Sequence, residues 1–203
     1  MWENKTMQIP NFKYFYNNKS EILDVILHGG SQGMDSSLIC KVVDASRGIG
    51  NSVAALNFPY IERGEDHSSG PELIEEIEAL KQVLNFCHFE NFKHIRLIGK
   101  SLGGIVVAAY LSRLSPNDQE KYSAYILGYD LGVRDIRNFN GAIRIVQGEK
   151  DKFGNVETVK KDMDGALSKN ITYLEIPNAD HSYRDPETKE PVFEDEAVKA
   201  LFT

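Results

Sequence analysis

The sequence predicts an α/β fold, a three-layer α/β/α sandwich with a mostly parallel sheet, and three observations lead to this prediction. The chain has 203 residues, 41% of them hydrophobic and 26% charged, which suits one domain over residues 1–203 with a sizeable core. Short apolar runs recur along the chain, and most are continuously apolar, as in strands that are covered on both faces. Amphipathic segments separate these runs, and repeated strand–helix units form parallel sheets with right-handed crossovers.

The expected elements follow one another in a regular order. Six strands are expected at 21–30, 52–58, 93–99, 123–129, 142–148 and 171–177. Asp35 or Ser36 can cap the first helix, and Pro71 suits the first position of the second. The acidic run that includes Glu76 is expected on a solvated face. The apolar stripes are Leu38, Ile39, Val42 and Val43, then Leu73, Ile74, Ile77, Leu80 and Leu84, and later Val156, Val159, Met163 and Leu167. Further helices are expected from Leu102 to about Leu114 and from Glu194 to Leu201.

Charge and composition disfavour several classes of protein. The net charge is −7, whereas nucleic acids and anionic membrane surfaces are bound by clustered Lys and Arg. Residues 1–20 contain no basic-then-apolar run typical of a signal peptide, and no apolar stretch reaches the roughly 18 residues of a membrane span. Cys40 and Cys87 have neither metal-site spacing nor the density of a disulfide scaffold. We therefore expect a cytoplasmic protein with no nucleic-acid or membrane partner.

The strongest local signal is the segment 94–111, HIRLIGKSLGGIVVAAYL. An apolar strand ends at Gly99, Ser101 lies at the turn, and Gly103 begins an apolar helix, which gives G-x-S-x-G in a strand–turn–helix context. A sharp turn that lifts a serine above the sheet crowds the residues two before and two after it, so both need minimal side chains. The backbone N–H of Leu102 is then directed at a developing oxyanion. These features predict a serine nucleophile.

A competing motif overlaps this segment. Gly99, Lys100 and Ser101 match the end of a phosphate-binding loop, G-x-x-x-x-G-K-[ST], with Asp130 as a magnesium-binding carboxylate. The first glycine of that motif would have to be His94, and residues 95–98 resemble a strand more than a loop. The phosphate-binding interpretation is therefore the weaker one.

Two later strand ends supply the partners that a serine nucleophile needs, a general base and an orienting carboxylate. The strand 142–148 is followed by Asp151, and the strand 171–177 is followed by His181. The chain order Ser101, Asp151, His181 is the order expected of a nucleophile elbow in this type of sheet. Asp130 also follows a strand and is the alternative acid.

An upstream loop completes the predicted site. The strand 21–30 runs into HGGSQG, and a glycine-rich strand-to-helix loop can direct a backbone N–H, that of Gly30 first, at the same oxyanion as Leu102. His28 in this loop is expected to make a structural hydrogen bond. Ser31 and Arg63 are candidate substrate-binding residues.

The HGGSQG loop, the GKSLGG turn, the QGEKD segment and the NADHSY segment together resemble the α/β-hydrolase superfamily. The nearest resemblance is to small lidless members related to dienelactone hydrolases, serine-aminopeptidase-like hydrolases and short-chain esterases. It extends from about residue 21 to the end of the chain. The resemblance implies that Ser101 is the nucleophile, His181 the base and Asp151 the orienting acid, with Gly30 and Leu102 forming the oxyanion hole.

The chain departs from that superfamily at two places. Members often begin with two or more additional strands, and only residues 13–16 (KYFY) offer one here. Members often carry a lid after the strand at 123–129, whereas only residues 130–141 lie there. We therefore expect a lidless, open pocket that suits small soluble substrates rather than long acyl chains.

Together these features predict a serine hydrolase that cleaves a small ester or thioester through an acyl-enzyme intermediate, without a metal or organic cofactor. Two alternatives remain open. One is an exopeptidase or amidase with the same triad, and the other is a non-catalytic binding protein of the same fold. The expected partner is a small-molecule substrate, and the chain is expected to be a monomer or a homodimer.

Overall fold

The protein contains one seven-stranded sheet that is parallel except at one edge. A computed structural model describes residues 9–203, apart from the side chain of Arg134. The strand order is β1-β3-β2-β4-β5-β6-β7, and only β1 runs antiparallel to its neighbour β3. The strands are β1 Phe12–Phe15, β2 Ile22–Leu27, β3 Ser52–Leu56, β4 His94–Lys100, β5 Tyr122–Leu127, β6 Ala142–Gly148 and β7 Ile171–Ile176. All the expected strands are present, and the KYFY segment forms the edge strand β1.

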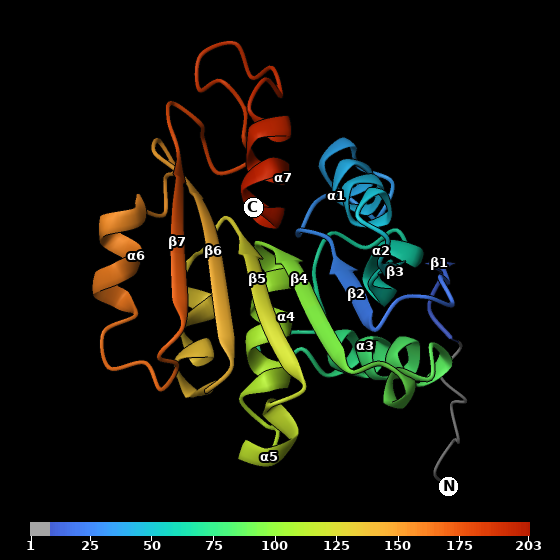
Figure 1. The fold of residues 1–203 in the computed structure, drawn as a ribbon. Helices are drawn as coiled ribbons and strands as arrows, with labels where there is room; N and C mark the ends of the chain where they lie inside the picture. Colours follow the sequence, from blue (N-terminus) through green and yellow to red (C-terminus); the bar gives the residue numbers. More distant parts are fainter. Residues whose placement is uncertain (1–8) are drawn as a thin grey trace, which may run out of the picture.

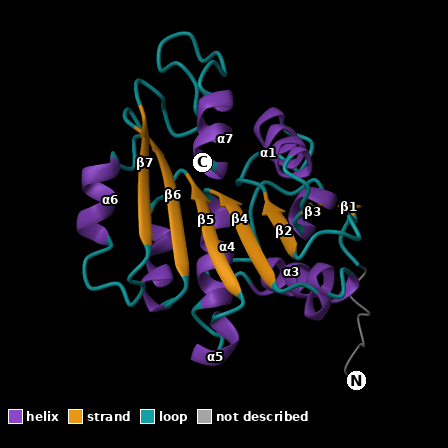
Figure 2. Cartoon of the chain, in the orientation of Figure 1, coloured by secondary structure: helices purple, strands orange, loops and turns teal. Residues whose placement is uncertain are grey.

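Helices cover both faces of the sheet, which confirms the predicted three-layer sandwich (Figures 1 and 2). The first and last helices share one hydrophobic cluster with one face, and α3 and α4 lie in the cluster on the other face. The helices are α1 Ser37–Gly48, α2 Pro59–Glu62, α3 Ile74–Phe86, α4 Leu102–Leu111, α5 Pro116–Gln119, α6 Val156–Asp162 and α7 Glu194–Phe202. Two 3-10 segments, Phe89–Asn91 and Leu131–Asn138, complete the chain. None of the helices in the described range 9–203 is long and apolar enough to cross a membrane.

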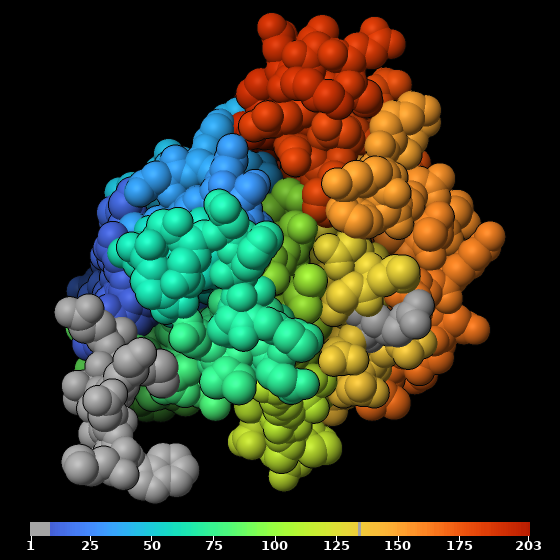
Figure 3. Space-filling view, turned by 180° about the vertical axis from the view of Figure 1, so that it is seen from behind, coloured from blue at the N-terminus to red at the C-terminus, as the bar shows by residue number. Residues whose placement is uncertain are grey.

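Helix α4 is the most deeply packed of these helices. It contacts β4, α3 and the 3-10 segment Leu131–Asn138, and nearly all of its residues are buried. In the view of Figure 3, α3 in teal to green and the Leu131–Asn138 segment in yellow flank the green α4 region. The short Leu131–Asn138 segment occupies the position where a lid was considered, and it packs on α4 through buried Val133 and Ile136.

The start of α3 differs from the prediction. Pro71 was expected in the first helical position, but α3 begins at Ile74, because Leu73 before it adopts a left-handed backbone with φ of 50°. Ile74 is consequently exposed instead of joining the apolar stripe. Glu76, expected on a solvated face, is fully buried and accepts hydrogen bonds from the backbone N–H and the hydroxyl of Ser69. This carboxylate ties the preceding loop to the first turn of α3.

The carboxyl ends of the parallel strands lie along one edge of the sheet, where α/β proteins bind their ligands. The turns after β2, β4, β6 and β7 all emerge there, and they carry the residues 28–33, Ser101, Asp151 and His181. The prediction of one domain over residues 1–203 also covers residues 1–8, which lie outside the described residues.

Candidate active site

Ser101 lies at the sharp turn between β4 and α4 with φ of 49° and ψ of −112°, a strained conformation for a residue with a side chain. A Cβ atom on Gly99 would lie 2.4 Å from the backbone of Gly103, and one on Gly103 would lie 2.4 Å from the carbonyl oxygen of Leu27. Both glycines of the motif are therefore required by close backbone approach. The phosphate-binding interpretation is wrong, because His94–Lys100 form a strand rather than a loop.

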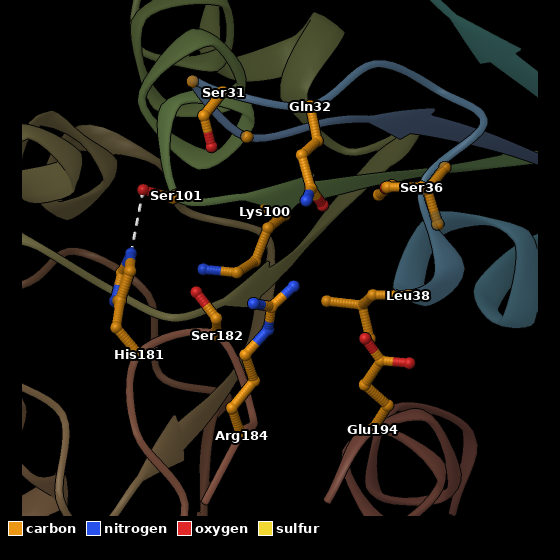
Figure 4. A pocket seen from close by; sticks show the side chains of 13 residues that line it. Ser31, Gln32, Ser36, Leu38, Lys100, Ser101, His181, Ser182, Arg184 and Glu194 are labelled. Carbon is orange, nitrogen blue, oxygen red and sulfur yellow. Dashed lines mark hydrogen bonds between the residues drawn. The ribbon is translucent and has the colours of Figure 1, made fainter. Parts of the chain in front are cut away.

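Three side chains from three different strand ends form a continuous hydrogen-bonded chain. The Nε2 atom of His181 lies 3.0 Å from the Oγ atom of Ser101 (Figure 4), and its Nδ1 atom lies 2.7 Å from the Oδ2 atom of Asp151. The Asp151 side chain is fully buried, whereas the imidazole keeps 14% of its surface exposed. Such an arrangement can activate a serine hydroxyl, because the imidazole accepts its proton and the buried carboxylate fixes the tautomer.

The carboxylate of Asp151 is held from both sides. Its Oδ1 atom accepts the backbone N–H of Phe153 at 2.9 Å, and its Oδ2 atom accepts the Nε2–H of Gln147 at 2.9 Å. Fully buried Gln147 also donates to the carbonyl oxygen of Gly154 at 2.7 Å and accepts the N–H of Tyr129 at 2.7 Å. Gln147 therefore joins the turns after β5 and β6 to the acid. Sequence reasoning missed it, although a glutamine near the end of the apolar run AIRIVQG was a usable signal.

The alternative acid, Asp130, has a different contact. Its Oδ1 atom accepts the backbone N–H of Gly132 at 2.8 Å and so caps the Leu131–Asn138 segment. The imidazole of His181 instead bonds to Asp151, and the ring of Phe153 packs edge-on against it at a centroid distance of 4.8 Å. Of the two candidate acids, the structure brings Asp151 to the imidazole.

The glycine-rich loop after β2 lies beside the nucleophile. A Cβ atom on Gly29 would lie 3.9 Å from the Cβ atom of Ser101. His28 fixes this loop, because its Nδ1 atom lies 2.6 Å from the carbonyl oxygen of Gly29 and its Nε2 atom accepts the backbone N–H of Phe58 at 3.0 Å. Burial lowers the pKa of His28, which suits the neutral tautomer that these two bonds require.

The two predicted oxyanion donors come from the turn after β4 and from the loop after β2. Leu102 is the first residue of α4, so its N–H has no partner within the helix. Gly30 belongs to the loop after β2, and its carbonyl oxygen is held by the hydroxyl of buried Tyr60 at 2.9 Å. The assignment of Gly30 and Leu102 to an oxyanion hole stays a prediction.

A cavity of about 180 Å³ opens beside Ser101 and His181. Its walls are the loop after β2, the turn after β4, the loop after β7 and the first residues of α1 and α7. Ser31, a candidate substrate-binding residue, lines it. Arg63, the other candidate, is exposed and pairs with Glu65 at 2.8 Å and with Glu75 at 2.7 Å, outside this lining.

Two basic side chains face this cavity. Lys100 precedes the nucleophile, and its ammonium points into the cavity beside Ser182 (Figure 4). Burial lowers its pKa to about 8. Arg184 follows His181 by three residues and extends its guanidinium toward the same space. Sequence reasoning did not assign Lys100 to the pocket, because strand alternation alone does not show which way its side chain turns at the end of β4.

The fold and the geometry of the site together are those of a hydrolase-type α/β protein. Comparison with family models leads to the same class. The model of the alpha/beta hydrolase domain matches residues 20–201. The chain therefore belongs to the α/β-hydrolase family, as the sequence resemblance predicted.

Solved structures of related fold cover nearly the whole chain. An alpha-beta serine hydrolase homologue from Coxiella burnetii has a TM-score of 0.72 and 18% identity, over 94% of this chain and 90% of that chain. Est1E from Butyrivibrio proteoclasticus, solved with ferulic acid bound, has a TM-score of 0.66 and 17% identity, over 93% and 92%. A dienelactone hydrolase from Anabaena variabilis has a TM-score of 0.67 and 12% identity, over 93% and 88%. No curated protein matches the sequence.

Proposed function

We propose that this protein is a serine hydrolase that cleaves small soluble esters or thioesters through an acyl-enzyme intermediate. The observation that carries the proposal is the chain of hydrogen bonds from Ser101 to His181 to Asp151, at 3.0 and 2.7 Å. Members of its family with such a chain of contacts use the serine as a nucleophile. The small cavity and the short Leu131–Asn138 segment favour a compact acyl group.

The reaction has two halves that use the same residues. The Oγ atom of Ser101 attacks the acyl carbonyl carbon while the Nε2 atom of His181 takes the hydroxyl proton, and Asp151 stabilises the imidazolium. The N–H groups of Leu102 and Gly30 stabilise the negative oxygen of the tetrahedral intermediate. When this intermediate collapses, the bond to the leaving group breaks and His181 delivers the proton to that group. A water molecule, deprotonated by His181, then attacks the carbonyl carbon of the acyl-enzyme. When this second intermediate collapses, the bond between the acyl carbon and the Oγ atom of Ser101 breaks, His181 returns the proton to that oxygen, and the acid is released.

The proposal predicts a single reactive serine. Incubation with a fluorophosphonate probe should add one probe mass to the intact wild-type protein, because an activated serine displaces fluoride from the probe. The Ser101→Ala variant should show no adduct and should lose turnover of short-chain aryl esters, with an unchanged circular dichroism spectrum. The matched control is Ser112→Ala, which removes a hydroxyl at the other end of α4 and should keep both the adduct and the turnover.

Intact-protein mass spectrometry decides the test. An adduct that persists in Ser101→Ala would remove Ser101 from the role of nucleophile. A folded wild type that forms no adduct would contradict an activated serine altogether.

A further inference from the structure

The cavity beside the nucleophile contains two positively charged side chains that have no partner of their own. Lys100 is only 8% exposed, and within the described part of the chain its ammonium makes no hydrogen bond or ion pair. Its ammonium lies beside Ser182 (Figure 4) and 5.9 Å from the centroid of the Tyr183 ring, and a Cβ atom on Gly128 would lie 2.8 Å from it. The Nε atom of Arg184 is buried and likewise lacks a hydrogen-bond partner among the described residues.

A basic side chain elsewhere that is largely removed from water has a carboxylate partner. Arg96 keeps only 12% of its side chain exposed, and it pairs with fully buried Asp24 at 2.6 Å. A buried charge without such a partner costs free energy, so its presence next to a catalytic serine calls for a ligand that supplies the missing charge. Within the described residues, Lys100 and Arg184 lack a carboxylate partner of the kind that Arg96 has.

The carboxylates near the pair already have other contacts. Asp151 bonds to His181 and Gln147. The Oδ1 atom of Asp180 accepts the backbone N–H groups of Ser182 and Arg184, at 2.8 and 3.0 Å. Glu194 accepts the hydroxyl of Ser37 at 2.7 Å in addition to the ammonium of Lys41. Among the described residues no carboxylate forms an ion pair with Lys100 or Arg184, and Asp151, Asp130 and Asp180 act on the Lys100 charge only from a longer distance. The first residues of α1, where a helix carries partial positive charge, line the same cavity.

We propose that Lys100 and Arg184 bind a carboxylate group of the substrate, so that the enzyme prefers esters or thioesters that carry a second, free acid. This inference rests on the proposed hydrolase function and names its substrate class. Arg presents a planar fork and Lys a point charge, and together they match a carboxylate placed between them. Glu194 on the far wall disfavours a second negative charge, so a monoanionic group fits better than a dianion.

The test compares matched esters that differ only in one free carboxylate. For the acyl half, the pair is 4-nitrophenyl hydrogen adipate and 4-nitrophenyl hexanoate. For the leaving half, the pair is 4-acetoxyphenylacetate and its primary amide, which has no second ester to cleave. In each case the enzyme-free rate is subtracted. We expect kcat/KM to be about tenfold to a hundredfold higher for the acid member of one pair, as charge-assisted hydrogen bonds in a buried site would give. The pair that shows the preference also shows which half of the substrate enters the cavity.

Three variants relate the preference to the two residues. Lys100→Met keeps the length of the side chain and removes the charge, and Arg184→Gln keeps hydrogen bonding and removes the charge. Each should lower the acid-to-neutral ratio of kcat/KM by about tenfold. Lys93→Met removes the same charge from an exposed site just before the amino end of β4, and it should leave the ratio unchanged. Fluorophosphonate labelling of each variant shows that Ser101 remains activated.

The outcomes separate the two proposals. Turnover of the neutral esters with no acid preference in either pair would overturn the carboxylate site and leave the hydrolase intact. An acid preference that remains in both Lys100→Met and Arg184→Gln would also overturn the carboxylate site and leave the hydrolase intact. Absence of labelling and of turnover on every ester would instead contradict the hydrolase function itself. A preference that falls in both variants and persists in Lys93→Met supports the carboxylate site.

Discussion

Asp151 and Asp130 carry the same carboxylate and follow neighbouring strands, and their surroundings give them different hydrogen-bond partners. Asp151 receives hydrogen bonds from His181, from Gln147 and from the N–H of Phe153. Asp130 accepts the N–H of Gly132 at the start of a 3-10 segment. A carboxylate orients a catalytic histidine only when it bonds to the imidazole nitrogen that faces away from the nucleophile. This difference can be tested residue by residue.

The Asp151→Asn variant should lose roughly 10³- to 10⁴-fold in kcat, because an amide can bond to the imidazole in the wrong tautomer and cannot stabilise the imidazolium. Asp130→Asn is the matched control, and it should retain nearly wild-type kcat, since an amide oxygen still accepts the N–H of Gly132. Steady-state kinetics on one short-chain aryl ester measures both variants. A larger loss in Asp130→Asn than in Asp151→Asn would assign the acid to Asp130.

At the residue scale, sequence reasoning succeeded for positions fixed by topology. Ser101, Asp151 and His181 each follow a parallel strand, so a linear sequence suffices to place them at one edge of the sheet. Gln147 and Lys100 lie within strands, near their carboxyl ends. Their roles depend on the direction in which each side chain points and on how deeply it is buried. Both depend on packing between elements that are far apart in the chain, which the sequence does not show.

At the scale of elements, Gly103 lets the unit β4–turn–α4 pack closely against the end of β2. Gly103 lies so close to the end of β2 that a Cβ atom would lie 2.4 Å from the carbonyl oxygen of Leu27 and 2.7 Å from that of His28. Both oxygens belong to backbone that leads into the glycine-rich loop. The next residue, Gly104, has its nearest neighbour at 3.2 Å, a methyl group of Ile126. Position 103 therefore has no room for a side chain, whereas position 104 has almost enough room for a methyl group.

Gly103→Ala should lower the free energy of unfolding by about 2–4 kcal/mol, because the new methyl group must push backbone apart, and overpacking of this kind has no compensating contact. It should also reduce turnover, since the backbone that it displaces leads to Gly30. Gly104→Ala should change the free energy of unfolding by less than about 1 kcal/mol, because the gain in helix propensity offsets a small side-chain adjustment. Urea unfolding followed by circular dichroism compares the two. Equal effects would contradict this account of the turn.

The predicted bounds of an element were good where burial of apolar residues alone sets them. They were poorer where a polar side chain makes a hydrogen bond at the end of the element. Continuous apolar runs indicated each parallel strand, because such strands are covered on both faces. The start of α3 was predicted three residues too early, since Leu73 takes a left-handed backbone and buried Glu76 holds Ser69 against the helix. Propensity favours Pro71 at a helix start, but a side chain that bonds to the preceding loop moved the start to Ile74.

At the scale of the whole molecule, the strand order brings together loops that are distant in sequence. Because β2 and β4 are neighbours, the loop after β2 lies against the turn that carries Ser101. The loop after β7 that carries His181 passes the ends of β6 and β5. A Cβ atom on Gly148 would lie 2.4 Å from the carbonyl oxygen of Ala179, and one on Gly128 would lie 3.1 Å from that of His181. The sequence predicted this common edge. The cavity, however, is also lined by the first residues of α1 and α7. Their position there depends on how these two helices pack together on one face of the sheet.

The buried charge of Lys100 affects the stability of the whole protein. Burial lowers its pKa from 10.5 to about 8, against the opposing influence of three carboxylates and with a small further contribution from Lys152. The carboxylates are Asp151, Asp130 and Asp180, and Arg184 and Glu194 line the same cavity. A pKa difference of this size corresponds to about 3 kcal/mol between the folded and unfolded states. The folded protein bears this cost at every pH at which Lys100 is protonated.

Lys100→Met should therefore raise the free energy of unfolding by about 3 kcal/mol at pH 7, as it lowers the preference for acid substrates. Between pH 8 and 10.5 the folded wild type has released the Lys100 proton and the unfolded chain still binds it, so wild-type stability rises with pH and the difference between the proteins shrinks. Burial raises the pKa of Cys87 to about 12, which weakens both proteins equally at high pH. Urea unfolding of both proteins from pH 7 to 10 measures this difference, and a constant difference over that range would contradict a charged, buried Lys100.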